Sequence, residues 1–139
     1  MVLELKRQFY ELINSLGYHI TDSGEYKELF PWLMLRTNGI QSQYSYDTLT
    51  ETVGFTLDIF STYPGEKEIL EIVENINANL NEFIKNSPYI IYGSQKSANI
   101  TDDKDTGPVR KHGIIKYNFL LTGARGGEPD DATISEPNI

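Results

Sequence analysis

The stretch from Val53 to Phe83 changes its hydrophobic period at Pro64, and this change predicts a strand followed directly by a helix. Before Pro64, apolar and polar residues alternate, as they do in a strand that buries one face; the apolar positions are Val53, Phe55, Leu57 and Ile59. After Pro64, which suits the first turn of a helix, apolar residues recur at helical spacing: Ile69, Ile72, Val73, Ile76, Leu80 and Phe83. Because Phe60 breaks the alternation, we expect the second face of the strand to be covered at that end.

The same reasoning predicts the other elements. Residues 2–16 carry apolar side chains at helical spacing and are followed by Gly17, a residue that commonly caps a helix. Shorter elements are expected as follows: a loop or short strand at 18–31, strands at 32–38, 89–97 and 112–123, a hairpin region at 39–48 and a polar loop at 98–110. We therefore predict an α+β fold, with an antiparallel or mixed β-sheet of about four strands and two helices packed on one face.

The 139 residues are enough for one domain of ordinary size, and we predict residues 1–122 to be that single domain. Residues 123–139 are rich in glycine, proline and acid, so they are predicted to form an acidic C-terminal arm. Ile134 and Ile139 are its only sizeable apolar side chains. We expect these two residues to anchor the arm on a neighbouring chain.

Composition narrows the classes of function. The formal net charge of −8 argues against tight binding to a phosphate backbone. The lack of cysteine excludes disulfides, thiolate metal sites and thiol nucleophiles. No apolar run approaches the roughly 20 residues of a membrane span, and the first residues lack the order of a signal peptide. We therefore expect a soluble protein made inside a cell.

The titratable residues form no recognisable catalytic or metal-binding motif. His19 and His112 are far apart, and each lacks an acidic residue at a suitable spacing, so we expect surface or strand-edge histidines. Asp58 lies in the middle of a strand and is expected to face solvent. The sequence "DDKDTG" has the acids of a calcium loop, but Lys104 occupies a ligand position. We predict no catalytic residue, no metal site and no cofactor.

The order of the elements resembles that of the tail-terminator or tail-completion proteins of long-tailed bacteriophages, which are also called head-to-tail joining proteins. The resemblance covers residues 1–122. Its pieces are the opening helix, "WLMLRTN", "VGFTLDIFSTYPGEKEILEIVENINANL" and "SANITDDKDTGPVRKHGIIKYNFLL". These are structural patterns, and none of them contains a catalytic signature.

The resemblance implies a structural virion protein of the tail or neck, without enzymatic activity, that assembles in the cytoplasm of the bacterial host. Such proteins form rings, typically hexamers, at the head-proximal end of the tail, where they end tube growth and join the tail to the head connector. The implied partners are further copies of the chain, the tail-tube protein and a head-completion or connector protein, with no membrane involved. DNA would pass through the ring without specific binding, and a strongly acidic ring would tend to repel it.

The polar loop is expected to project from the sheet towards the DNA channel or the adjoining ring. Four of its residues are the predicted interaction residues of the folded domain: Asp102, Asp103, Lys104 and Asp105. Ile134 and Ile139 of the C-terminal arm are the other two predicted interaction residues.

Two other functions stay open at this stage. One is a cytoplasmic adaptor that uses the same fold to bind a partner protein. The other is a small enzyme whose site is assembled from scattered groups such as His112, Asp58 or Tyr117. A concave site around those three groups would favour the enzyme, whereas association of the chain with itself would favour the ring.

Overall fold

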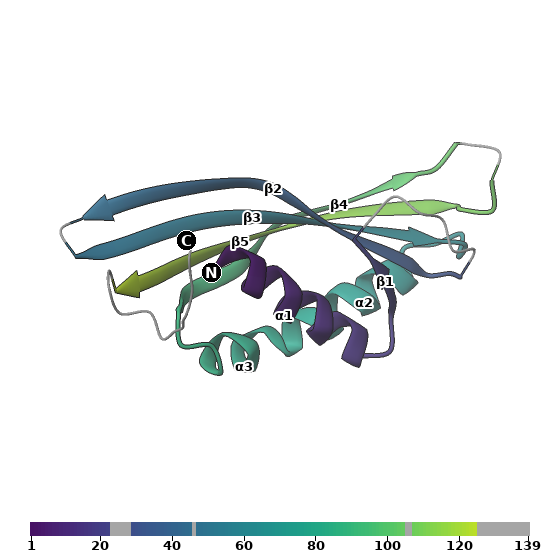
Figure 1. Ribbon diagram of the computed structural model, residues 1–139. Coiled ribbons are helices and arrows are strands. Elements are labelled where there is room, and N and C mark those ends of the chain that lie inside the picture. The colour runs from purple at the N-terminus through teal and green to yellow at the C-terminus, as the bar shows by residue number, and fades with distance from the viewer. Residues whose placement is uncertain (23–28, 46, 105–106, 125–139) are drawn as a thin grey trace.

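The computed structural model describes residues 1–22, 29–45, 47–104 and 107–124, and it confirms the predicted α+β fold. The elements in chain order are α1 (Val2–Ser15), β1 (His19–Thr21), β2 (Trp32–Ser45), β3 (Thr48–Ser61), α2 (Lys67–Ala78), α3 (Leu80–Lys85), β4 (Ile90–Asp102) and β5 (Lys111–Ala124) (Figure 1). The sheet has five strands, one more than predicted, because β1 adds a short outer strand. The predicted arm at 123–139 overlaps the end of β5 and otherwise lies outside the described residues.

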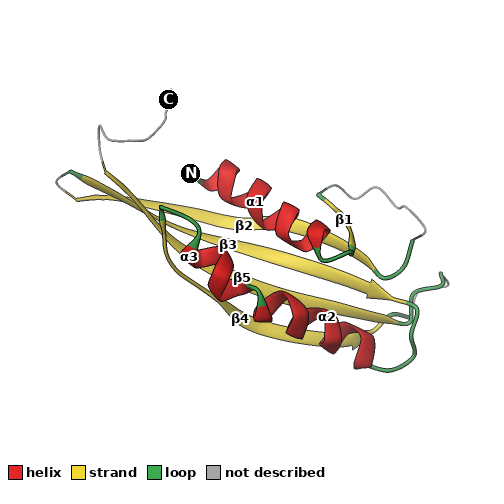
Figure 2. Ribbon diagram, turned by 90° about the horizontal axis from the view of Figure 1, so that it is seen from below, coloured by secondary structure: helices red, strands yellow, loops and turns green. Residues whose placement is uncertain are grey.

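The sheet is mixed, and its strands lie in the order β1-β2-β3-β5-β4. β1 runs parallel to β2, whereas the other neighbouring pairs are antiparallel. All the helices lie over the same face of the sheet, as predicted (Figure 2). No helix of the described residues lies over the opposite face, and we call it the helix-free face. None of the helices in the described part of the chain is both long and apolar enough to cross a membrane.

The helix predicted to start at Pro64 begins later, at Lys67. Ser61, the last residue of β3, explains the delay. Its hydroxyl accepts a hydrogen bond of 3.0 Å from the backbone N–H of Tyr63 and donates one to the carboxylate of Glu68. These two bonds hold the connection in a turn, so the helix cannot start until the turn is complete.

The predicted long helix is also divided, at Asn79, into α2 and α3. The side-chain amide of Asn79 donates a hydrogen bond of 2.8 Å to the backbone carbonyl of Asn75. Side chains that bond the backbone in this way compete with regular helix, which is why asparagine favours helix ends. The apolar stripe survives the division, since Leu80 is buried and Phe83 packs against the core.

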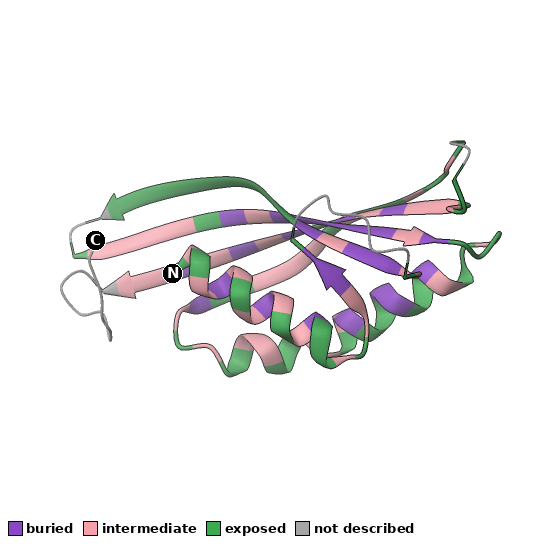
Figure 3. Cartoon of the chain, turned by 45° about the vertical axis from the view of Figure 1, so that its right-hand side comes forward, coloured by how far each residue is buried: buried purple, intermediate pink, exposed green. Residues whose placement is uncertain are grey.

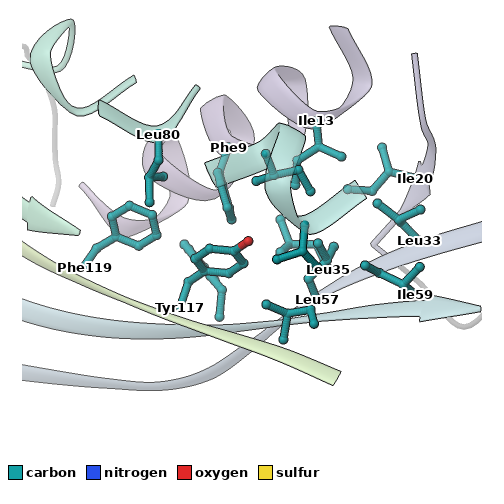
Figure 4. Close-up of a cluster of buried hydrophobic side chains, with 14 of the residues drawn as sticks. Phe9, Ile13, Ile20, Leu33, Leu35, Leu57, Ile59, Leu80, Tyr117 and Phe119 are labelled. Atoms are coloured by element: carbon teal, nitrogen blue, oxygen red, sulfur yellow. The ribbon is translucent and has the colours of Figure 1, made fainter. Parts of the chain in front are cut away.

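The core lies between the helices and the sheet. The alternating apolar residues of β3 point into it, as predicted, and each is fully buried: Val53, Phe55, Leu57 and Ile59. Phe9 of α1 lies at its aromatic centre, near Tyr117 and Phe119 (Figure 4). Its ring centroid is 5.3–6.0 Å from those of four neighbouring rings: Phe55, Phe83, Tyr117 and Phe119. Phe9 thus joins its own helix α1 to α3 and to the strands β3 and β5.

Three strands are longer than predicted. β3 begins at Thr48, before the predicted start at Val53, and β2 and β4 end later than predicted. β2 continues past residue 38 to Ser45, through the predicted hairpin region, and β4 continues to Asp102, into the predicted loop. In both segments the strand is held by pairing with a neighbour, β2 along β3 and β4 along β5. Because these segments bury neither face fully, their sequences lack the alternation from which a strand is predicted.

Gly93 in β4 lies where the core leaves no room for a side chain. A Cβ atom there would come within 2.5 Å of the buried ring of Phe119. Because such overlap forces neighbouring groups to move, Gly93→Ala should lower the free energy of unfolding by about 1–3 kcal/mol. Gly39→Ala is the matched control, since a Cβ atom at that position of β2 meets nothing within 4 Å. Denaturant titration would measure both, and equal losses in the two variants would contradict this packing.

Candidate functional site

Asp58 is the centre of a charged cluster on the helix-free face. Its side chain is 3% exposed. Nε of Arg36, in β2, donates a hydrogen bond of 2.7 Å to one carboxylate oxygen, and Nε2 of His112, in β5, lies 2.9 Å from the other. The three residues belong to adjacent strands, so the cluster ties β2, β3 and β5 together.

The surroundings of Asp58 keep it ionised. Burial would raise the pKa of this carboxyl group, but hydrogen bonds from His112 and Arg36, together with their charges, hold the pKa below its ordinary value. The hydrogen bond to Asp58 in turn raises the pKa of Arg36. Asp58 therefore accepts hydrogen bonds as a carboxylate and is a poor proton donor near neutral pH.

Three stacked rings continue the cluster towards β1. Phe60 lies between the other two, with ring centroids 4.8 Å from Trp32 and 4.5 Å from His112. Nε1 of Trp32 donates a hydrogen bond of 3.1 Å to the hydroxyl of Thr21 in β1. The expectation that the second face is covered near Phe60 is confirmed, and the covering groups are neighbouring side chains of the sheet itself.

Two predictions about this region are wrong. Asp58 does not face solvent, since the residue is only 2% exposed. For His112, the strand-edge alternative is wrong, because β5 lies inside the sheet, although its side chain is 26% exposed, as the surface alternative expects; it also has an acidic partner in Asp58. The partner lies 54 residues away in sequence, and only the register of β3 with β5 brings the two together. His19 does lie in the outer strand β1, as predicted.

In the described part of the chain, neither a paired hydroxyl nucleophile nor a metal-binding group accompanies the cluster. No described hydroxyl group hydrogen-bonds to the carboxylate of Asp58 or to the ring of His112, so no nucleophile is paired with them. Within the same residues, no three His, Cys, Asp or Glu side chains are grouped to hold a metal ion. Together with the stacked rings and the hydrogen bond from Trp32 to Thr21, the cluster connects four strands of the sheet: β1, β2, β3 and β5.

The groups considered for an enzyme do not converge on one hollow. Tyr117 is buried among the core residues, and its hydroxyl donates a hydrogen bond of 3.0 Å to Asn77 of α2, on the side of the helices. A hollow of about 370 Å³ lies elsewhere, between β1 and α2, and its lining includes His19, Glu68 and Glu71. Neither Asp58 nor Tyr117 lines it.

The first part of the predicted interaction loop, up to Asp102, is strand. Asp102 is the last residue of β4, and its carboxylate forms an ion pair with Lys111 at the start of β5. The backbone N–H of Asp103 donates a hydrogen bond of 3.0 Å to the carbonyl of Arg110, and Lys104 is exposed. Asp105, Ile134 and Ile139 lie outside the described residues. The structure thus brings Asp102 and Asp103 together at one end of the sheet.

The outer edges of β2 and β4 form a second candidate site, which sequence reasoning missed. β1 pairs with β2 only over residues 32–34, so no described strand covers the outer edge of β2 over residues 35–43. β4 is the other outer strand of the sheet. The β2–β3 hairpin extends past the helices, and the far half of β2 is exposed (Figure 3).

Exposed apolar side chains gather on these two edges. Ile40 is 51% exposed and Tyr44 is 66% exposed on β2, whereas Ile91 is 53% and Tyr92 is 59% exposed on β4. Exposed apolar groups that cluster on a surface mark sites of interaction with other molecules. The signal was present in the sequence as "GIQSQYS" and "IIYGSQ", two uncharged stretches, but their pairing partners could not be assigned from it.

Comparison with known proteins assigns neither a family nor a function to the chain. No protein family matches the chain, and a search of curated proteins finds no match. The site is therefore interpreted from its own geometry.

Lowering the pH should weaken the Asp58 cluster. Because the pKa of Asp58 is lowered by folding, its contribution to stability is fully present above its ordinary value of about 3.9 and is lost as pH falls through the lower folded value. The difference in the free energy of unfolding between the wild type and Asp58→Asn should therefore shrink as pH falls from about 6 to about 2. Asp102→Asn, which changes an exposed carboxylate, is the control and should show a smaller difference. Denaturant titrations across this range test it, and a difference that did not vary with pH would contradict it.

Proposed function

We propose that the protein is a structural component of a phage virion. It forms a ring at the head-proximal end of the tail, ends growth of the tail tube and joins the tail to the head connector. The resemblance of residues 1–122 to tail-terminator proteins motivates this proposal. The observation that carries it is that one subunit presents two unlike sheet edges, β2 and β4, with exposed apolar side chains on both.

Two unlike edges are what a closed ring requires. In a ring, each subunit uses one surface to contact its neighbour on one side and a different surface to contact the other. Because the helices cover only one face of the sheet, both edges remain accessible along much of their length (Figure 2). A symmetric dimer would instead need only one self-complementary surface.

The Asp58 cluster has a supporting role in this proposal. Together with the stack of Trp32, Phe60 and His112, it joins β1, β2, β3 and β5 at the end of the sheet far from the β2–β3 turn. A neighbouring subunit that binds near the β2–β3 turn would therefore contact strands whose arrangement is already fixed at the opposite end of the sheet.

The test is an assembly reaction with the tail-tube protein of the same phage. Adding the protein to growing tubes should produce short tubes with extra density at one end, seen by electron microscopy. Tubes that keep growing, with no density at their ends, would contradict the proposed function. Addition of an equal amount of an unrelated acidic protein is the control for a charge effect on tube growth.

A further inference from the structure

We propose that copies of this chain join edge to edge through their sheets. The outer edge of β2 at residues 35–43 of one copy would pair, antiparallel, with the outer edge of β4 at residues 90–95 of the next. This inference rests on the proposed function. A ring requires two unlike surfaces on each subunit, and the inference identifies these surfaces as the edges of β2 and β4. We call these stretches the β2 tip segment and the β4 tip segment.

Strand direction permits this pairing. From β2 to β4 the sheet crosses β3 and β5, and each step is antiparallel, so β2 and β4 run in opposite directions. Rotation about an axis roughly along the strands leaves their directions unchanged. β4 of one copy and β2 of the next would therefore meet as antiparallel neighbours, and the alternation within the sheet would continue across the contact.

The two tip segments also lie at the same level of the sheet. Gln41 pairs with Thr52, Thr52 pairs with Leu120, and Leu120 pairs with Tyr92. These four residues thus form one row from edge to edge. Neighbouring copies can bring the segments together with little displacement along the strands.

Each edge has a protected part outside its tip segment. On β2, the strand β1 covers residues 32–34. On β4, Lys96 follows the tip segment directly, and lysines discourage pairing at a sheet edge. The tip segments differ, because no described strand covers them, and Arg36, which pairs with Asp58, is the only charged residue in either segment. Pairing is thereby directed to the end of the sheet near the β2–β3 turn.

Apolar side chains favour the same pairing. Of the nine large hydrophobic residues that are exposed in the described chain, four lie within or beside the tip segments: Ile40, Tyr44, Ile91 and Tyr92. A register shift between Ile90 and Tyr92 leaves Ile91 without an opposite residue in β5. Edge-to-edge pairing would place residues of the next copy beside these groups, on both faces of the sheet, and so reduce their contact with water.

Engineered cysteines test this pairing directly, because the chain has none of its own. Four double variants combine Gln41→Cys or Gln43→Cys with Tyr92→Cys or Ser94→Cys, which samples several registers on the helix-free face. After mild oxidation, at least one combination should give a ladder of disulfide-linked multimers on a denaturing gel without reductant, and reductant should collapse it to the monomer. No ladder from any combination, under conditions where the protein is a ring by mass, would overturn the inference.

Matched controls identify the strands involved. Gln41→Cys alone and Tyr92→Cys alone should not give linked dimers, because each edge would contact the other kind of edge. Efficient dimers from either single variant would indicate pairing of like edges and overturn the inference.

Glu74→Cys with Lys116→Cys places two exposed cysteines away from both edges and should give no ladder. An equally strong ladder from that pair would mean that the links form by random collision.

The two proposals fail in different ways. A ring by mass without crosslinks would leave the proposed function standing and reject this interface. A chain that stays monomeric in every variant, alone and with tail tubes, would reject both.

Discussion

Replacing Phe9 by alanine is expected to lower the free energy of unfolding by about 3–5 kcal/mol. Phe9 is fully buried and contacts rings from three other elements, β3, α3 and β5. Truncation would remove apolar surface from the core and leave a cavity that rigid strands cannot close. Small domains are stable by only about 5–15 kcal/mol, so this single change would remove a large part of the total.

A urea titration followed by circular dichroism would measure this loss. Leu3→Ala is the matched control, because Leu3 belongs to the same helix but is 83% exposed. Exposed substitutions usually change stability by less than about 0.5 kcal/mol. Similar losses in the two variants would show that Phe9 does not hold the core together.

Replacing Ile40 by lysine should have the largest effect on assembly. Ile40 is 51% exposed in the β2 tip segment, so the isolated chain should tolerate the change with little loss of stability. At a contact between two sheets, however, the ammonium group would lose water without gaining a partner. We expect the dissociation constant of the assembly to rise at least about 100-fold, which corresponds to about 2.7 kcal/mol.

Sedimentation velocity over a range of concentrations would measure this change. Asn81→Lys, at an exposed position of α3, adds the same charge away from both edges and should leave assembly unchanged. If the two variants assembled alike, the β2 tip segment would not be part of the contact. If Ile40→Lys unfolded the chain, its circular dichroism spectrum would show it before any conclusion about assembly was drawn.

The elements that bury one face were predictable from sequence. The unit from Val53 to Phe83 has a clear period on each side of Pro64, because one side of each element packs on the core. Residues 39–45 of β2 and 98–102 of β4 were not predictable as strands. Their side chains are mostly exposed on both faces, so only the neighbouring strand, and not the alternation of residues, holds them extended.

The charged cluster was hidden for a different reason. Arg36 and His112 lie 22 and 54 residues from Asp58, and nothing in the spacing links them. Their meeting depends on the register of three strands, which sequence periodicity does not define. Two signals could have drawn attention to this position: a carboxylate between apolar neighbours, and Phe60 on the face expected to be polar.

The combination of a braced end and an open end distinguishes this sheet. Ion pairs and stacked rings hold the strands near Trp32, where β1 also covers the edge of β2. At the opposite end, the edges are uncharged and carry exposed apolar groups. Long exposed edges invite association with further strands, and we infer that this chain uses them for ordered assembly with its own copies.

The mass of the native protein in solution, measured by light scattering over a range of concentrations, is the most direct test of ring formation. A closed ring predicts one defined multiple of the 15.8 kDa chain that does not grow further as concentration rises. The resemblance to tail-terminator proteins implies six copies. A mass that stays at 15.8 kDa at every concentration, with no binding to added tail tubes, would contradict ring formation.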